Sequence, residues 1–384
     1  MDDVLIVGAG PAGSVAATVL ARAGARVRLI DRAAFPREKL CGDTVNPGTL
    51  ALLQRLGLAG SIERRGLRVD GMLVTGDGGI SVTARYPRGL SGRAIARSEL
   101  DCALVECAVE AGATLDTGVT ARGGLVTTTS RGEQVVDGVE AGSSLSRRSF
   151  RARITIAADG RRSALAFGLR LARHPARPRR WAIGAYFEHD TRASTLGEMH
   201  IRLGRYIGVA PVRDGLVNVC LVKPAVGGDC EFGDPERLLR REIASEPLLR
   251  DRLADARIVR PPLMLGPLAI DVTRPGIDGL ILAGDAAGFI DPMTGDGLRF
   301  AVGGGELAAA AALRALEHGW RGVHAWLEAE RRRVFAGKWR LNRALRALVA
   351  SPASIRAAGI GARLAPVVIR QLVARAGDCG LAAD

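Results

Sequence analysis

Two glycine-rich stretches, far apart in the chain, have residue types that bind phosphate and polyol groups. In the first, Gly8, Gly10 and Gly13 form the spacing G-x-G-x-x-G directly after an apolar run, and Asp31 lies 23 residues after Gly8. Such glycines permit a tight turn and a close approach of the backbone to a pyrophosphate, while the acid accepts hydrogen bonds from a ribose. The pattern predicts a dinucleotide site at a helix N-terminus.

The second stretch, residues 284–298, indicates which dinucleotide is bound. It follows another apolar run and holds Asp285, Gly295 and Gly297 ahead of an Ala-rich helix. A flavin must be held at both ends. Asp285 can bind the ribityl chain, and the helix N-terminus near Gly297 can face the pyrimidine edge, where its dipole stabilises negative charge. The two stretches together predict FAD. The electron donor expected for such a flavoprotein is NAD(P)H or ferredoxin.

Alternating strands and helices must position these residues. Apolar runs at 4–7 and 26–30 predict buried strands on either side of a helix, which makes a βαβ unit. A third buried strand is expected at 280–283, directly before the second glycine-rich stretch. Ser98 is expected to cap a helix over residues 99–111, because an acid follows three residues later.

The fold class predicted is α/β: a Rossmann-type FAD-binding domain with a mostly parallel sheet, an inserted substrate domain with an antiparallel sheet, and C-terminal helices. Alternating patterns at 181–188, 198–203 and 216–222 predict the antiparallel sheet. We expect the FAD-binding domain to be discontinuous and to alternate with the other parts. The expected boundaries are 1–66, 97–170 and 270–318 for the FAD-binding domain, 67–96 and 171–269 for the substrate domain, and 319–384 for the C-terminal helical segment.

The chain resembles the flavoprotein group that includes geranylgeranyl reductases and, more distantly, p-hydroxybenzoate hydroxylase-type monooxygenases. The stretches that carry the likeness are 8–13 with Asp31-Arg32, 40–43, 158–160 and 284–298, and Arg97 fits a further family pattern. The likeness spans roughly residues 1–315. It implies FAD contacts at Gly8, Gly10, Ala12, Gly13, Asp31, Arg32, Cys41, Gly42, Arg97, Val119, Asp159, Asp285, Gly295, Gly297 and Leu298.

Two positions favour the reductase branch of this group. Gly288 stands where the hydroxylases usually have His, and the pair Cys41-Gly42 is typical of the reductases. The resemblance therefore implies hydride transfer from reduced flavin to a C=C bond of a prenyl or polyketide chain, with Cys41 as the candidate catalytic residue. A small side chain that only packs at this position is the alternative for Cys41.

Other functions stay open at this point. A monooxygenase of this group would use NAD(P)H and O₂ to hydroxylate an aromatic or polyketide substrate, and a non-catalytic flavin-binding protein would carry out neither reaction. The strand at 205–211 lacks the Trp that the reductases tend to have there, so the substrate is left open. Flavin-dependent halogenases share the fold but need a catalytic Lys near residue 75, and 69–83 contains none.

Composition limits the expected partners. The net charge is +14, and almost all of the positive charge comes from Arg. No dense basic run is interleaved with aromatic residues, so nucleic acid is not expected as a partner. The six Cys show no metal-binding spacing, and no metal is expected. We expect a cytoplasmic protein with a small lipophilic substrate and no obligate protein partner, because neither a signal peptide nor an apolar run of ~18 residues is found.

An apolar stripe marks the C-terminal segment. Ile360, Leu364, Val368 and Leu372 recur every four residues, as on one face of a helix. Two interpretations follow from this pattern. The stripe either packs on the protein core or makes peripheral contact with the inner face of the membrane, where it would collect a lipid substrate.

Overall fold

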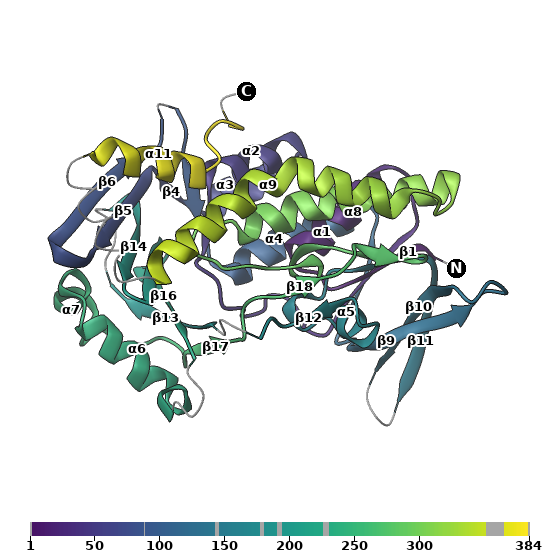
Figure 1. Ribbon diagram of the computed structural model, residues 1–384, viewed down its shortest axis with the longest axis horizontal. Helices are drawn as coiled ribbons and strands as arrows, with labels where there is room; N and C mark the ends of the chain where they lie inside the picture. The colour runs from purple at the N-terminus through teal and green to yellow at the C-terminus, as the bar shows by residue number, and fades with distance from the viewer. Residues whose placement is uncertain are drawn as a thin grey trace.

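The computed structural model describes residues 2–87, 89–142, 146–176, 180–189, 194–225, 230–350 and 365–382. Figure 1 shows an elongated molecule with a sheet near each end of its long axis and long helices running between them. The N-terminus lies beside one sheet, and the last helix covers the other. The two sheets correspond to the predicted parallel and antiparallel sheets, so the predicted fold class is confirmed.

The first sheet is built around the predicted βαβ unit, which consists of β1 (Asp2–Val7), α1 (Pro11–Arg22) and β2 (Val27–Asp31). Its strand order is β19-β20-β11-β1-β2-β8, and every neighbouring pair from β20 to β8 is parallel. A hairpin extends from β11 in antiparallel fashion. The added strands are β8 (Thr114–Thr117), β9 (Ala121–Thr128), β10 (Gln134–Gly142), β11 (Arg147–Ala157), β19 (Gly276–Ile277) and β20 (Leu280–Leu282).

Helix α4 (Arg97–Glu110) corrects one prediction. Ser98 does not cap it: the N-cap is Ala96, and no side chain caps the first turn. The helix begins earlier than expected because Arg97 belongs to the first turn. From there its guanidinium reaches the Asp101 carboxylate, four residues on, at 2.7 Å, and both side chains are buried. This buried ion pair fixes the start of the helix in place of a cap.

The second sheet has the strand order β17-β13-β16-β15-β14-β5-β6. Its pairs are antiparallel, as predicted, except that β14 and β5 run parallel. Its strands are β5 (Gly71–Gly76), β6 (Ile80–Arg85), β13 (Arg180–Glu188), β14 (Leu196–Arg202), β15 (Arg205–Val212), β16 (Leu216–Pro224) and β17 (Leu263–Leu265).

Alternation along these strands gives the second sheet two different faces. Ile207, Val219 and Leu221 pack with apolar residues of α6 (Pro235–Ala244) and α7 (Pro247–Leu253) in one core cluster. Neighbouring positions such as Gly208 and Cys220 point to the opposite face, toward the FAD-binding region. A sheet of this kind can therefore close a cavity on one face while it is stabilised on the other.

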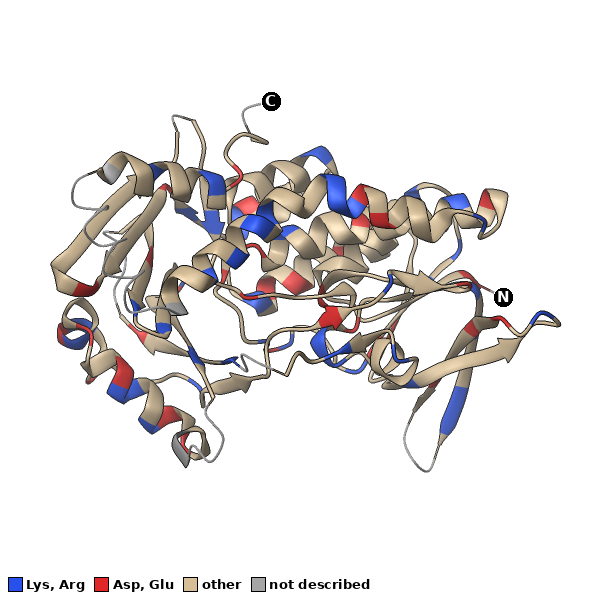
Figure 2. Ribbon diagram, viewed as in Figure 1, with Lys and Arg blue, Asp and Glu red and all other residues tan. Residues whose placement is uncertain are grey.

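The remaining elements connect or cover the two sheets. Among the described residues, no helix combines the length and apolar character that spanning a bilayer requires. Charged residues are spread over all parts of the molecule in Figure 2. The remaining helices and strands are α2 (Pro47–Arg55), α3 (Ala59–Arg65), α5 (Ala164–Gly168), α8 (Gly297–His318), α9 (Val323–Ala350), α11 (Pro366–Ala376), β3 (Thr44–Val45), β4 (Leu67–Val69), β7 (Gly92–Ala94), β12 (Ala172–Arg173) and β18 (Asp271–Val272).

The close packing of α8 on α1 generates the first testable prediction. A Cβ on Gly305 of α8 would come within 2.3 Å of the Ala12 carbonyl oxygen, whereas a Cβ on Gly337 of α9 would meet nothing within 4 Å. Gly305→Ala should therefore lower the free energy of unfolding by ~1–3 kcal/mol, because the helices must move apart. The matched control Gly337→Ala should raise it by up to ~1 kcal/mol through helix propensity. Urea unfolding curves measure both; equal effects would contradict the packing described.

Candidate functional site

A cavity of about 180 Å³ lies between the two sheets, where the two glycine-rich stretches meet. The carboxyl ends of β1 and β20 lead into its walls, as the carboxyl ends of parallel strands do at nucleotide sites. We call it the flavin cavity. The residues implied by the resemblance that line it are Gly10, Ala12, Cys41, Gly42, Arg97, Asp285, Gly295, Gly297 and Leu298.

The glycines of the first stretch shape the turn at one end of this cavity. Gly8 has φ +98°, and a Cβ there would lie 2.5 Å from the Ala158 carbonyl oxygen. A Cβ on Gly13 would lie 1.8 Å from the Gly8 carbonyl oxygen. Gly10 is different, because a Cβ there would meet only the tip of the Arg37 side chain, at 3.3 Å. Gly8 and Gly13 keep the turn closed, and Gly10 leaves room for a ligand at the N-terminus of α1, which fits a pyrophosphate.

Three residues predicted to contact FAD lie outside the lining of the flavin cavity: Asp31 ends β2, Arg32 follows it, and Val119 lies just after β8. The Asp31 carboxylate accepts hydrogen bonds from the backbone N–H groups of Ala9 at 2.8 Å and Ala33 at 2.9 Å. Val119 donates its N–H to the Asp31 carbonyl oxygen at 2.9 Å, and Arg32 is exposed. Asp31 therefore ties the glycine turn to β2, and the predicted contacts with a ribose and an adenine stay predictions.

Asp159 also lies outside this lining. Its carboxylate accepts a hydrogen bond from the Ala164 N–H at 2.9 Å and so holds the turn that precedes α5. Burial raises the pKa of this carboxyl. The neighbours Gly160 and Arg161 do line the cavity, and the Arg161 guanidinium lies 4.0 Å from the Asp285 carboxylate. Asp159 thus positions a wall of the cavity, while its predicted contact with the cofactor stays a prediction.

The loop before α8 is held firmly against the second sheet. The Asp291 carboxylate accepts hydrogen bonds from the Tyr206 hydroxyl of β15 at 2.5 Å and from the Met293 N–H at 3.0 Å. The buried Asp296, the N-cap residue of α8, lies 2.8 Å from the Lys338 ammonium of α9. These contacts fix Gly295 and Gly297 at the wall of the cavity, where the positive end of the α8 dipole can face a flavin ring.

The turn at Cys41 is fixed in the same way on the opposite side. Asn218 of β16 donates to the Cys41 carbonyl oxygen at 2.9 Å and also to the Asp43 carboxylate. Asp43 has no solvent exposure and a left-handed backbone, with φ +52°. The Tyr186 hydroxyl of β13 donates to the same carboxylate oxygen at 2.5 Å. Strain and burial concentrated at one turn are typical of a functional site.

Burial also sets the protonation of this turn. Burial raises the pKa of the Asp43 carboxyl to about 7, although hydrogen bonds from Tyr186 and Asn218 act in the opposite direction. Burial likewise raises the pKa of the Cys41 thiol, and the Arg97 guanidinium beside it opposes this shift. At neutral pH the Cys41 side chain is therefore a protonated thiol, which suits an acid rather than a nucleophile. No sequence pattern pairs Asp43 with Asn218, which lie 175 residues apart in the chain.

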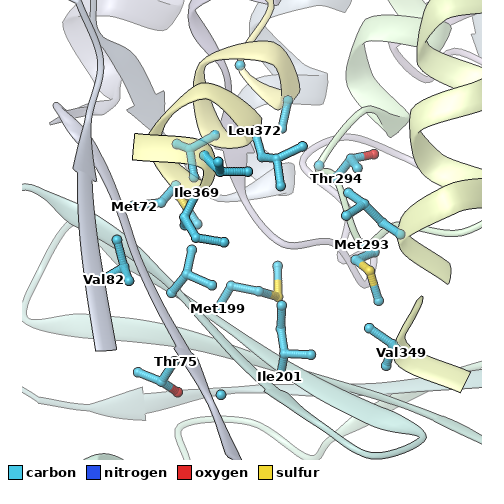
Figure 3. Close-up of a pocket in the computed structure, with 18 of the residues that line it drawn as sticks. Met72, Thr75, Val82, Met199, Ile201, Met293, Thr294, Val349, Ile369 and Leu372 are labelled. Atoms are coloured by element: carbon cyan, nitrogen blue, oxygen red, sulfur yellow. The ribbon is translucent and has the colours of Figure 1, made fainter. Parts of the chain in front are cut away.

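A second, larger cavity of about 470 Å³ adjoins the flavin cavity, and we call it the apolar cavity. Thr44, Met199 and Gly295 line both cavities, which are therefore direct neighbours. Figure 3 shows apolar side chains that point into this space from β5, β6 and β14 on one side and from α9 and α11 on the other. Its lining includes Met72, Val74, Ile80, Val82, Met199, Ile201, Met293, Leu345, Leu348, Val349, Val368, Ile369, Leu372 and Val373.

Part of the predicted C-terminal apolar stripe lines the apolar cavity. Val368 and Leu372 lie on α11, which covers the apolar cavity, and both line it. Val368 is nevertheless 47% exposed among the residues that the structure describes. Ile360 and Leu364 lie outside the described residues. The described part of the stripe therefore faces a cavity of the protein rather than a filled core.

The chain is similar to known FAD-binding proteins. The family described as "FAD binding domain" matches residues 1–340. Menaquinone reductase of Mycobacterium tuberculosis is 33% identical over 332 residues, which cover 80% of this chain and 75% of the relative. Conditioned medium factor receptor 1 of Dictyostelium discoideum is 28% identical over 333 residues, or 82% of this chain, and the chain spans only 63% of its length.

Solved structures show the same fold. A geranylgeranyl bacteriochlorophyll reductase-like protein from Thermoplasma acidophilum matches with a TM-score of 0.78 and 22% identity, over 97% of this chain and 98% of the other. The myxobacterial chondrochloren halogenase matches with a TM-score of 0.82 and 20% identity, over 96% of this chain and 90% of the other. Since both reductases and halogenases adopt this fold, the chemistry must be argued from the cavities.

The glycine turn generates a prediction on cofactor binding. The purified protein should be yellow, with FAD bound. Gly10→Val should abolish FAD binding while the chain still folds, because only the tip of Arg37 stands near the new side chain in the protein itself. Gly123→Ala is the control, since a Cβ on Gly123 meets nothing within 4 Å. Visible absorbance and FAD titration measure both. A colourless wild type that takes up no FAD would rule out the site.

Proposed function

The chain belongs to the FAD-binding flavoprotein family that includes these reductases, and on this basis we propose that it reduces C=C bonds in a lipophilic substrate of the prenyl or polyketide type. NAD(P)H is the proposed electron donor. The proposed FAD contacts are those implied by the resemblance, with Gly10 at the pyrophosphate, Asp285 at the ribityl chain and the N-terminus of α8 at the flavin ring. Bound there, FAD supplies the hydride that the reduction requires.

One observation carries this proposal: the apolar cavity adjoins the flavin cavity and shares lining residues with it. Burial of a hydrocarbon chain in such a cavity is favourable by ~25 cal/mol per Å² of apolar surface removed from water. The shared residues Thr44, Met199 and Gly295 mark the place where a chain in one cavity would reach a flavin in the other. The protein's own part is then to bind the chain, to orient one double bond and to exclude water.

Cys41 is the proposed catalytic residue. It lines the flavin cavity, and its thiol is protonated at neutral pH because burial raises its pKa. A thiol in that state can give a proton to a carbon atom of the substrate. Asn218 donates a hydrogen bond to the backbone carbonyl oxygen of Cys41, so the turn that carries the Cys41 side chain is fixed.

The reaction type generates a third prediction. With electrons from NADPH or dithionite and no oxygen, a substrate with prenyl double bonds should gain two hydrogen atoms. Under ¹⁸O₂ it should gain no label, whereas a monooxygenase product would contain one labelled oxygen atom. Met199→Trp should slow turnover by at least ~10-fold while FAD stays bound, because the indole would obstruct the passage between the cavities. Val126→Trp, on the partly exposed hairpin strand β9, is the control and should turn over like the wild type.

Peripheral membrane contact through α11 is the remaining part of the proposal. Val367 and Val368 are 56% and 47% exposed, and Arg370 and Arg375 on the same helix are exposed as well. Apolar side chains flanked by cations fit an anionic lipid surface, which would be the inner face of the membrane.

Flotation with anionic vesicles at low salt tests this fourth prediction. The wild type should float with the vesicles, and Val367→Glu should reduce flotation several-fold, since a carboxylate would have to enter the lipid surface. Flotation with neutral vesicles serves as the comparison. Failure of the wild type to bind anionic vesicles would remove the membrane contact and leave the reductase proposal intact.

A further inference from the structure

Saturation of a C=C bond consumes a proton as well as a hydride, and both cavities are largely apolar. This inference rests on the proposed function, because the proton in question is the one that the reduction of a C=C bond consumes. Bulk water would deliver the proton readily, yet the same water would have to enter the space that holds the lipid. The chain must therefore supply and replace the proton through its own side chains.

Most titratable groups in the lining of the flavin cavity are unsuited to this task. The Tyr206 hydroxyl already donates to Asp291, and burial raises the pKa of the Cys220 thiol to about 12. Asp285 lies near the Arg161 guanidinium. The arginines stay protonated at neutral pH. Burial lowers the pKa of the Lys39 ammonium, which makes Lys39 a second acid in this lining. Cys41 is the donor proposed above, and once it has given up its proton it must be protonated again.

Asp43 lies where such a replacement can start. It is two residues from Cys41 in the chain and has no exposure to solvent. Both of its hydrogen bonds, from Tyr186 and Asn218, go to one carboxylate oxygen, Oδ2. Oδ1 is buried and has no hydrogen-bond partner of normal geometry among the described residues, although the Arg97 N–H lies near enough to lower the pKa of the carboxyl. Oδ2 of this carboxyl accepts two hydrogen bonds, and Oδ1 is the oxygen at which the carboxyl can hold a proton.

Tyr186 is the hydroxyl-bearing residue that contacts this carboxyl. The residue is half-buried, and its hydroxyl donates to Asp43 Oδ2. A hydroxyl can accept a proton from water and donate one to the carboxylate in the same movement. Asn218, which cannot titrate, binds both Asp43 and the Cys41 carbonyl oxygen and so keeps the two groups in register.

We propose that Asp43, held by Tyr186 and Asn218, is a positioning residue that reloads Cys41 with the proton consumed in each turnover. In the reduction, one alkene carbon receives the hydride from the reduced flavin and the other receives the proton from the Cys41 thiol. The C=C π bond breaks, two C–H bonds form, the flavin is oxidised and the alkene is reduced. The Cys41 thiolate then takes a proton from the Asp43 carboxyl, and Asp43 regains one from solvent through Tyr186.

The environment of the Asp43 carboxyl determines how turnover should depend on pH. Tyr186 faces it from β13, Arg97 from α4 and Cys41 from its own turn, and Cys220 lies near on β16. Burial raises the pKa of Asp43 to about 7, so its protonated form is present below that pH and is lost above it. Steady-state turnover of the wild type should therefore fall as the pH rises through about 7.

Asp43→Asn tests the proposal, because the amide has nearly the shape of the carboxyl but cannot relay a proton. With flavin reduced by dithionite, the variant should form about one product per flavin at the wild-type rate, using the proton already on Cys41. Later turnovers should be slower by ~10²-fold or more, since the contribution of a general acid is of that order. The fall in rate near pH 7 should disappear. Tyr186→Phe should show the same burst with a milder loss.

Asp291→Asn is the matched control, because Asp291 is another buried carboxylate that accepts a tyrosine hydroxyl at 2.5 Å. Whatever its rate, this control should retain the wild-type fall near pH 7 and show no burst. Steady turnover in Asp43→Asn and Tyr186→Phe within about 3-fold of the wild type, with the same pH profile, would overturn the proposal. A uniform slowing of the first and later turnovers in both variants would overturn it too, since that is the effect of a distorted site.

A second readout needs neither FAD nor substrate. In the flavin-free protein, ionised Asp43 raises the pKa of the Cys41 thiol through its negative charge. Asp43→Asn should therefore lower that pKa, and iodoacetamide should alkylate Cys41 faster at pH 8, as followed by peptide mass spectrometry. An unchanged alkylation rate would overturn the link between the two side chains. If this link is present and no alkene is reduced by the wild type, the proposed function fails.

Discussion

The second sheet must present one continuous face to two different ligands, and the rest of the structure depends on this constraint. Side chains alternate along a strand, so Gly208 and Cys220 face the flavin cavity while Ile207 and Val219 pack against α6 and α7. Met199, on the next strand but one from Cys220, lines both cavities. A shift of one residue in register would turn the apolar wall away from the cofactor and expose the core. The helices on the far face are what stabilise this register.

Several polar groups enclosed between the sheets are paired across elements that are distant in sequence. Tyr206 binds Asp291 in the loop before α8, and Tyr186 with Asn218 binds Asp43 in the turn that carries Cys41. Buried polar groups cost free energy unless they are hydrogen-bonded, so these contacts hold both loops in one position. The result is a flavin cavity whose two sides are fixed by the sheet that also forms the wall of the apolar cavity.

The sequence predicted the parts that depend on local spacing. The βαβ unit, the two glycine-rich stretches and the alternating strands all follow from neighbours in the chain, and they were placed within a few residues. The helix α4 begins two residues earlier than predicted, with Arg97 of its first turn paired with Asp101 and no side-chain cap. The apolar cavity could not be predicted, because Met72, Met199 and Leu372 come together only when β5, β14 and α11 are packed. The partners of Asp43 were missed for the same reason.

The central claim is that a lipid chain in the apolar cavity reaches the flavin and takes its electrons. Anaerobic stopped-flow absorbance tests this most directly: the protein is reduced with one equivalent of dithionite and mixed with a polyprenyl lipid in detergent. The account predicts that the absorbance of oxidised flavin returns without oxygen, at a rate that saturates with lipid and with one double bond consumed per flavin. Flavin that stays reduced at every lipid concentration, and is oxidised only when air is admitted, would contradict it.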